Sequence, residues 1–222
     1  MKAAAAPLPL FADADGELPS SKDVLGLNVA GRVLLGRSDT IVYVADDSVV
    51  KFTGDAIVNA ANEGCLGGGG IDGEVNRRGG VDLRMAREAL PLIDHSRRCE
   101  TGDAKITVAG DLPCDKVIHA VGPRFSDGPG ADHEGDLDLL ESAYKSSLER
   151  ACENGLTSVA FCIISAGIYR GSCPLRTVIE KGLESIAKHV YPGLKCVVLC
   201  GFTPEEQTVL KTILQDIKDG RV

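Results

Sequence analysis

Hydrophobic residues in this chain form short continuous runs that are separated by longer amphipathic stretches. Runs rich in β-branched and other apolar residues predict strands at 41–44, 56–58, 106–108, 117–121, 159–164 and 196–199. Most of these runs are continuous rather than alternating, which is typical of strands covered on both faces. Apolar residues at helical spacing predict helices over 137–151, 175–190 and 209–217.

Residues typical of helix termini support the end of one predicted helix and the start of another. The dipeptide Asn154-Gly155 follows the first helical stretch and is a typical helix end. The segment TPEE at 203–206 precedes the last one. It supplies an N-cap hydroxyl, a proline at the first helical position and an acid three residues after the cap.

The alternation of strands and helices predicts an α/β fold with a largely parallel sheet layered between helices. We expect one domain over residues 23–222, preceded by a flexible extension over 1–22 that lacks periodicity and carries Ala, Pro and acids. Ligands of such sheets bind beyond the carboxyl ends of the strands. The loops after Val58, Val121 and Ile164 are therefore the expected location of a site.

Composition narrows the class of protein. Hydrophobic residues make up 44% and charged residues 25%, as in ordinary globular domains. No apolar run is long enough to span a membrane, and the first 19 residues resemble neither a signal peptide nor an Arg-rich transit peptide. Eight scattered cysteines without zinc-ligand spacing indicate reduced thiols. We expect an intracellular protein, cytoplasmic or nuclear, and the extension leaves an organelle address open.

The net charge of −8 argues against direct nucleic-acid binding, because neutralising many phosphates needs clustered Lys and Arg. It leaves room for a small anionic ligand held by backbone amides.

The glycine-rich segment at 54–73, GDAIVNAANEGCLGGGGIDG, carries the most information about function. Four consecutive glycines at 67–70 are costly to order and permit the close approach of a ligand or another backbone. Amides exposed there, followed by a helix that starts near Asp72, would form a nest that holds a diphosphate without lysine. The pattern equally allows Asp72 to be no more than an N-cap.

Two familiar nucleotide motifs do not fit this segment. Gly68, Gly70 and Gly73 match the dinucleotide pattern G-x-G-x-x-G, but residues 59–66 separate the strand from the glycines. The region where a ribose-binding acid would follow, 81–95, has a helical pattern. A nicotinamide-dependent oxidoreductase is thus disfavoured, and the absence of Gly-Lys-Ser/Thr after the glycines excludes a P-loop.

Several motifs in order resemble one family. DAIVNAAN followed by LGGGGIDG resembles the ADP-ribose-binding signature of macrodomains, and the similarity continues through ETGDAKIT, KVIHAVGP and SAGIY, over roughly residues 40–215. The most similar branch is the MacroD type. The resemblance implies a three-layer α/β/α macrodomain sandwich with a mixed, largely parallel central sheet. It also implies a hydrolase that removes mono-ADP-ribose from Asp and Glu side chains and deacetylates O-acetyl-ADP-ribose.

Because binding-only macrodomains exist, a non-catalytic reader of mono-ADP-ribosylated proteins is the alternative. The implied partners are ADP-ribose and mono-ADP-ribosylated proteins. We expect no metal, no cofactor, no nucleic-acid or membrane partner, and a monomer.

The resemblance also implies roles for individual residues. An acid just upstream of the glycine segment would bind adenine, and Asp47 is the first choice with Asp46 as the alternative. Asn62 would bind the distal ribose while Asn59 ties the loop together. The remaining expected contacts with the ligand come from β-strand, glycine-loop and second-loop residues: Ile57, Gly68, Gly69, Gly70, Ile71, Asp72, Ser165, Ala166, Gly167, Ile168 and Tyr169.

Asp72, Asn62 and Gly70 form the expected catalytic set, with Asp72 accepting a proton from the attacking water or holding that water. On this hypothesis Asp72→Ala keeps ADP-ribose affinity within about tenfold while turnover falls by roughly 10²-fold or more. Tyr169 would pack on the distal ribose, or else be a partly buried core aromatic. His119, in an apolar strand, is expected to be a hydrogen-bonded core residue.

Two positions depart from the family pattern. Asn76 stands where many MacroD-type sequences carry histidine, and an amide cannot act as a base near neutral pH. This favours the reader, whereas Asp72 together with ETGDAKIT favours the hydrolase. Arg170 follows Tyr169 where glycine is common, and it either contacts a phosphate at the rim or is solvated.

Overall fold

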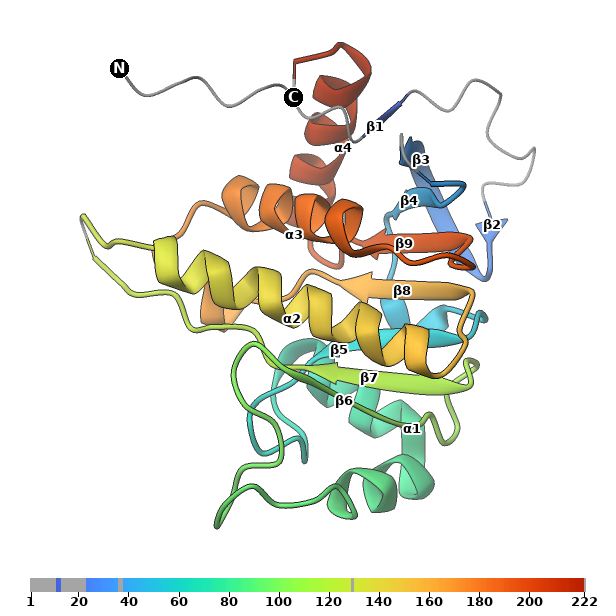
Figure 1. Cartoon of the computed structure of the whole chain (residues 1–222), viewed down its shortest axis with the longest axis vertical. Coiled ribbons are helices and arrows are strands. Elements are labelled where there is room, and N and C mark those ends of the chain that lie inside the picture. Colours follow the sequence, from blue (N-terminus) through green and yellow to red (C-terminus); the bar gives the residue numbers. More distant parts are fainter. Residues whose placement is uncertain (1–10, 13–22, 36–37, 129, 222) are drawn as a thin grey trace.

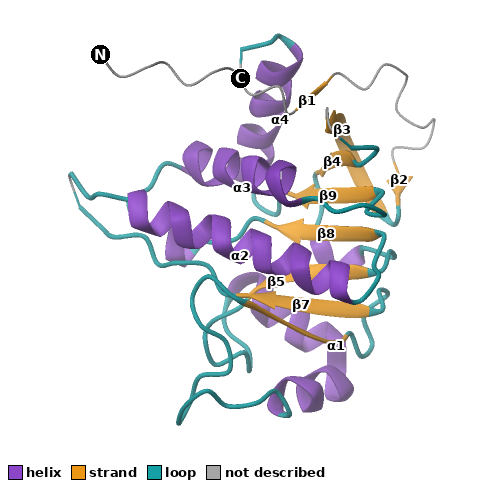
Figure 2. Ribbon diagram, in the orientation of Figure 1, coloured by secondary structure: helices purple, strands orange, loops and turns teal. Residues whose placement is uncertain are grey.

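A mixed nine-stranded sheet lies at the centre of the molecule (Figures 1 and 2). The structure is a computed structural model and describes residues 11–12, 23–35, 38–128 and 130–221. The strands are β1 (Phe11–Ala12), β2 (Asp23–Val24), β3 (Leu27–Leu35), β4 (Ile41–Ala45), β5 (Ala56–Ala60), β6 (Ala104–Val108), β7 (Lys116–Ala120), β8 (Ser158–Cys162) and β9 (Cys196–Cys200).

The spatial order of the strands is β1-β3-β4-β9-β8-β5-β7-β6, with β2 paired to β3. The neighbours from β4 through β9, β8 and β5 to β7 are parallel, and the outer pairs β3–β4 and β6–β7 are antiparallel. The prediction of a mixed, largely parallel sheet is therefore confirmed. The carboxyl ends of β4, β5, β7, β8 and β9 lie at one edge of the sheet, where their arrowheads point in Figure 1.

Helices cover both faces of the sheet. They are α1 (Gly70–Glu88), α2 (Glu134–Glu153), α3 (Leu175–His189) and α4 (Pro204–Lys218), with 3₁₀ turns η1 (Val49–Lys51) and η2 (Ile168–Arg170). One core joins one face of the sheet to α2, α3 and α4, and a second core joins the opposite face to α1 and η1. Figure 2 shows α2 and α3 in front of the sheet and α1 behind it. The three-layer α/β/α sandwich is confirmed.

The six predicted strands and three predicted helices are all present. Helix α2 has Asn154 as its C-cap. Helix α4 begins with a full capping box, in which the Glu206 amide donates to Thr203 Oγ1 at 3.2 Å and the Thr203 amide donates to Glu206 Oε2 at 3.0 Å. Strand β3 was not predicted, although its burial alternates along its length.

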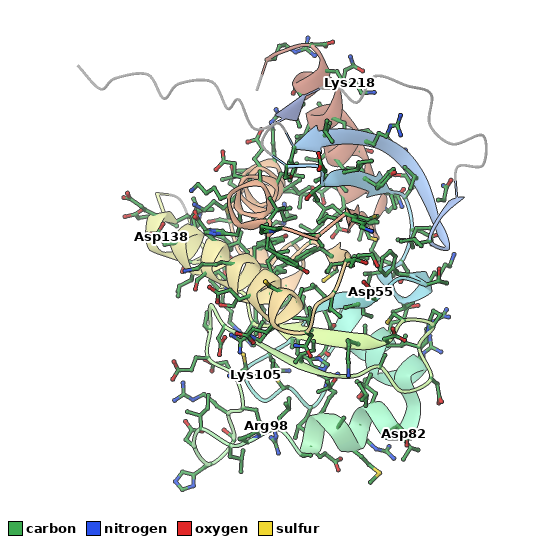
Figure 3. All side chains as sticks on the ribbon, turned by 45° about the vertical axis from the view of Figure 1, so that its right-hand side comes forward. Asp55, Asp82, Arg98, Lys105, Asp138 and Lys218 are labelled. Atoms are coloured by element: carbon green, nitrogen blue, oxygen red, sulfur yellow. The ribbon has the colours of Figure 1, made fainter. Side chains whose placement is uncertain are left out.

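Strand β5 directs alternate side chains to opposite faces, as a pleated strand must. Ile57 belongs to the core on the α1 face and Val58 to the core under α2 and α3. Asn59, two residues after Ile57, therefore points toward α1. At the opposite edge of the sheet, Asp55 (labelled in Figure 3) accepts hydrogen bonds from the amides of Thr157 and Ser158, at 2.6 and 3.0 Å, which ties the start of β5 to the start of β8.

Helix α1 is interrupted at Gly80, which has φ 67° and ψ −153°. The two helical segments run in different directions in the lower part of Figure 1. The interruption matters because it brings the end of α1 back toward its beginning.

The expected extension over residues 1–22 lies outside the described residues except for Phe11 and Ala12, which pair with Leu35 and Leu34 of β3. All eight cysteines are free thiols, and six are buried. Within the described ranges, the helices are too short or too polar to cross a membrane. No cluster of metal-ligand side chains occurs among the described residues.

Candidate functional site

The site is built at the carboxyl edge of the parallel strands, where the loops after β5, β7 and β8 meet. The loops after β7 and β8 are joined directly: the Phe125 amide donates to the Tyr169 carbonyl at 2.8 Å, and Ser165 Oγ donates to the Pro123 carbonyl at 2.8 Å. The prediction that chemistry lies after Val58, Val121 and Ile164 therefore corresponds to one continuous surface.

The glycine loop between β5 and α1 is held from within by Asn62. Its Nδ2 donates to the Gly67 carbonyl at 2.8 Å and its Oδ1 accepts from the Gly64 amide at 3.1 Å. Asn62 thus fastens the loop, a role that the sequence analysis had expected of Asn59.

Gly68 lies directly over Asp72. An added Cβ at Gly68 would lie 3.0 Å from Asp72 Oδ2 and 3.3 Å from Asn62 Nδ2, so a larger residue would displace both side chains. Asn76, one helical turn after Asp72, lies near the loop: a Cβ added at Gly67 would be 3.4 Å from Asn76 Nδ2.

Gly69 and Gly70 face open space. No atom lies within 4 Å of a Cβ added at either position. Gly70 has φ 57°, which itself favours glycine. Gly69 has φ −89° and ψ 179°, a conformation that any residue adopts. Neither packing nor conformation requires a glycine at 69, which is the N-cap of α1, a position where glycine is common.

Asp72 is a buried carboxylate, with only 3% of the residue exposed. It is the third residue of α1, and the N-cap is Gly69, so the N-cap alternative for Asp72 is wrong. Its Oδ1 accepts hydrogen bonds from Asn59 Nδ2 and Arg87 Nη2, each at 2.7 Å. Its Oδ2 is buried and has no hydrogen-bond partner among the described residues.

Asn59 links Asp72 to a buried histidine. Asn59 Nδ2 also lies 3.3 Å from His119 Nδ1, and His119 Nε2 lies 2.9 Å from Thr107 Oγ1, which in turn donates to the Val108 carbonyl. This order assigns the ring hydrogen to Nε2, because an amide nitrogen can only donate to Nδ1. Burial, with a smaller contribution from the charge of Arg87, holds the pKa of His119 well below its ordinary value. His119 is thus a neutral, hydrogen-bonded core residue, as expected.

Arg87 is a site residue that the sequence analysis missed. It is fully buried and forms a salt bridge with Asp72, while its Nε donates to the Cys65 carbonyl at 2.5 Å. One guanidinium therefore holds both the acid and the start of the glycine loop.

The loop that precedes ETGDAKIT packs on the same glycine loop. The Arg98 amide donates to the Glu63 carbonyl at 2.8 Å, and Thr101 Oγ1 donates to Glu63 Oε1 at 3.2 Å. Figure 3 labels Arg98 in the lower part of the molecule, below the sheet. Thr107, which bonds His119, belongs to the same motif. The motif therefore supports the site through both Thr101 and Thr107, although it is distant from the glycine loop in the sequence.

The second loop contains Ser165, Ala166, Gly167 and Ile168 and ends at Tyr169. Ser165 and Ala166 are buried, Gly167 is open to solvent and Ile168 is 90% exposed. A single exposed apolar side chain is ordinary on a protein surface, so the exposure of Ile168 does not by itself identify a ligand site.

Tyr169 is half-buried, which leaves both expectations for its ring open. The Arg124 guanidinium carbon lies 4.2 Å from the centre of its ring, and Arg124 Nη2 donates to the Tyr169 hydroxyl at 3.1 Å. Arg124 is thus a second residue that the sequence analysis missed. Arg170 lies 3.7 Å from Glu205 Oε2 at the surface, a long ion pair that leaves both of its proposed roles open.

The two candidate adenine acids are both paired. Asp46 accepts from Lys211 at 2.5 Å and Asp47 from Lys51 at 2.8 Å. Partial burial alone would raise the pKa of Asp47, but hydrogen bonds from Lys51 and the Ser48 amide hold it below the ordinary value. Ser48 Oγ donates to Glu74 Oε2 at 3.1 Å, so this segment contacts α1.

Among the remaining expected contact residues, Ile57 is fully buried in the core. Ile71 is half-buried and packs against the core on the α1 face. The full burial of Ile57 leaves its side chain without a surface that a ligand could touch, so Ile57 is a core residue.

Comparison with known proteins agrees with this geometry. The Macro domain family matches residues 58–187. A Macro domain-containing protein of Mesorhizobium japonicum is 41% identical over 167 residues, covering 75% of this chain and 88% of its own length. The O-acetyl-ADP-ribose deacetylase of Escherichia coli K12 is 37% identical over 155 residues, covering 69% and 84% respectively. A macrodomain of Oceanobacillus iheyensis solved with ADP superposes with a TM-score of 0.72 at 26% identity, covering 82% of this chain and 94% of that one.

Proposed function

This chain belongs to the macrodomain family, and from that premise we propose that it binds ADP-ribose and hydrolyses acyl esters of its distal ribose. The substrates are O-acetyl-ADP-ribose and proteins that carry mono-ADP-ribose on Asp or Glu. Relatives named O-acetyl-ADP-ribose deacetylase, 37–44% identical, support the first of these. The free cysteines support an intracellular setting.

The observation that carries the proposal is the position of Asp72. A buried carboxylate lies directly beneath a glycine loop, with one oxygen fixed by two donors and the other without a partner. An unpaired buried carboxylate oxygen is costly to maintain, and such groups concentrate at functional sites.

Binding rests on the two loops. The amides around Gly69 and Gly70 at the start of α1 would hold the diphosphate, where the helix dipole favours negative charge. The second loop, from Ser165 to Ile168, would close over it, and Tyr169 would pack on the distal ribose. Asp47, or Asp46, would accept a hydrogen bond from the adenine amino group.

In the reaction, water adds to the acyl carbon and the bond between that carbon and the ribose oxygen breaks. Asp72 Oδ2 accepts a proton from the water and passes it to the ribose oxygen as that oxygen leaves, which restores the carboxylate. The products are the free carboxylic acid and ADP-ribose. Binding energy from the diphosphate and adenine serves to orient the ester.

The reader remains the second candidate, and a specific observation favours it. Asp72 is nearly sealed from solvent and is already paired with Arg87, and Asn76 offers no base. A module of this kind would bind ADP-ribose and leave the ester intact.

The test is to incubate the purified protein with O-acetyl-ADP-ribose and, separately, with a protein auto-modified on glutamate. Hydrolysis releases acetate and ADP-ribose in the first assay and free ADP-ribose in the second. The reader predicts calorimetric binding of ADP-ribose with neither product. An absence of binding at millimolar ADP-ribose would reject both candidates.

Asp72→Asn is the variant that tests the role of this acid. Asparagine keeps the shape of the side chain, whereas alanine would leave the buried Arg87 charge without a partner of similar shape. We expect ADP-ribose affinity within about tenfold of the wild type and turnover lowered by roughly 10²-fold or more. Equal losses of affinity and turnover would reject a catalytic role for Asp72.

A further inference from the structure

The kink in α1 brings together two residues that a straight helix would keep apart. Asp72 and Arg87 are 15 positions apart, which corresponds to about 22 Å along a straight α-helix. Yet Arg87 Nη2 lies 2.7 Å from Asp72 Oδ1. The break at Gly80 is what allows the second half of α1 to fold back under the first.

Arg87 contacts two parts of the site at the same time. Its Nη2 donates to the acid and its Nε donates to the Cys65 carbonyl, three residues after Asn62. Because the guanidinium is planar and rigid, these two donors fix the carboxylate relative to the glycine loop.

The pairing is also selective for one carboxylate oxygen. Arg87 and Asn59 both donate to Oδ1, and Oδ2 is left buried against Gly68 without a partner among the described residues. A carboxylate with free rotation would present either oxygen to the ester. Here Oδ1 is held by two donors, and Oδ2 is the oxygen left without a partner among the described residues.

We propose that Arg87 is a positioning residue for the hydrolysis, which holds Asp72 so that Oδ2 faces the reacting ester beneath the glycine loop. The inference rests on the proposed function. It predicts that loss of Arg87 lowers kcat far more than it weakens binding, because the diphosphate and adenine contacts do not involve Arg87. Misplacing a reacting group by about 1 Å can cost about 10²-fold in rate.

The main variant is Arg87→Met, which keeps an unbranched apolar stem in the core but removes the guanidinium with its charge and donors. We expect kcat for O-acetyl-ADP-ribose to fall by at least about 30-fold, with KM and the ADP-ribose Kd each changed by less than about threefold. Arg87→Lys restores a cation but not the two-donor fork, so its kcat should fall between those of Arg87→Met and the wild type.

A double-mutant cycle separates positioning from general damage. If Arg87 acts through Asp72, Arg87→Met in an Asp72→Asn background should change kcat by less than about threefold. Leu83→Ala is the control for a general loss of stability. Leu83 is fully buried one turn before Arg87, and its apolar side chain makes no hydrogen bond. The Leu83→Ala variant should lower the urea midpoint while leaving kcat per folded molecule within about twofold of the wild type.

Three results would overturn the inference. The first is a folded Arg87→Met protein whose kcat equals that of the active wild type. The second is an equal proportional loss of kcat when Arg87→Met is introduced into the wild type and into Asp72→Asn. If Arg87→Met does not fold, Arg87→Lys decides the matter, and wild-type kcat in that variant counts against the inference. A wild-type protein that binds ADP-ribose but releases no product would instead reject the proposed function, and the role of Arg87 with it.

Discussion

Replacing Gly80 with alanine tests whether the kink in α1 is required by the structure. Gly80 adopts φ 67° and ψ −153°, a region that is almost exclusive to glycine. An added Cβ would also lie only 2.1 Å from Asp111 Oδ2, so the Asp111 side chain would have to move. The variant must either hold alanine in this conformation or straighten the helix.

The magnitudes of the two alternatives decide what to expect. Holding alanine at these angles costs about 1–3 kcal/mol. Moving Asp111 adds up to about 1 kcal/mol, in line with an off-rotamer side chain. Straightening α1 would gain about 1 kcal/mol of helix propensity, but it would separate Arg87 from Asp72, and breaking a buried ion pair costs about 3–5 kcal/mol. The kink should therefore persist, with a net loss of about 1–4 kcal/mol.

Urea denaturation of Gly80→Ala and the wild type measures this difference. The double variant Gly80→Ala/Asp111→Gly removes the steric conflict, so it should recover only the smaller part of the loss. Gly135→Ala is the matched control, since Gly135 lies in the first turn of α2 with nothing near an added Cβ, and alanine there should be neutral or stabilising by up to about 1 kcal/mol. A Gly80→Ala protein within about 0.5 kcal/mol of the wild type would refute the reasoning.

Three further predictions concern binding and stability. Gly69→Glu should fold normally and weaken ADP-ribose binding by at least about tenfold, because a carboxylate would face the diphosphate. Thr212→Glu, on the exposed face of α4, is the control: it makes the same charge change and should leave the calorimetric Kd unaltered. Glu141→Gln should cost about 1 kcal/mol at pH 7. Hydrogen bonds from Lys181 and its neighbours lower the pKa of Glu141 from 4.5 to about 2, so this cost should be full above about pH 5 and vanish as the pH falls toward 2 in acid-denaturation curves. Thr203→Ala should remove the α4 capping box and cost about 1 kcal/mol, with faster amide exchange in the first turn of α4; unchanged exchange there would contradict it.

Local patterns predicted the elements of this fold well because each signal lay within a few residues. The box TPEE requires only four consecutive positions to start α4. The apolar runs of the central strands are continuous because both faces of the sheet are covered. Strand β3 was missed because only alternate residues of it are buried, and Asn28, Gly31 and Arg32 interrupt its apolar run.

The division of roles between Asn59 and Asn62 was harder to predict. Both are amides at the carboxyl end of β5, Asn59 within the strand and Asn62 two residues after it, so spacing alone does not assign their roles. The alternation of side chains along the strand distinguishes them. Asn59 lies on the α1 face with Ile57 and reaches Asp72, whereas Asn62 lies beyond the end of the strand and bonds the loop backbone. The expectation that Asn62 contacts the distal ribose remains a prediction.

Arg87 shows where a sequence pattern stops being informative. A charged residue near the end of a polar helix is ordinarily assigned to the surface, because arginine is rarely buried unless it is paired. Its partner is 15 positions away on the same helical face, about 22 Å along a straight helix, so the two would not be expected to touch. The only local hint is Gly79-Gly80, a pair that is unfavourable within a helix and therefore typical of a kink. A helix that is broken at such a pair can return its last turn to its first. A buried acid at one end then becomes a reason to look for a cation at the other.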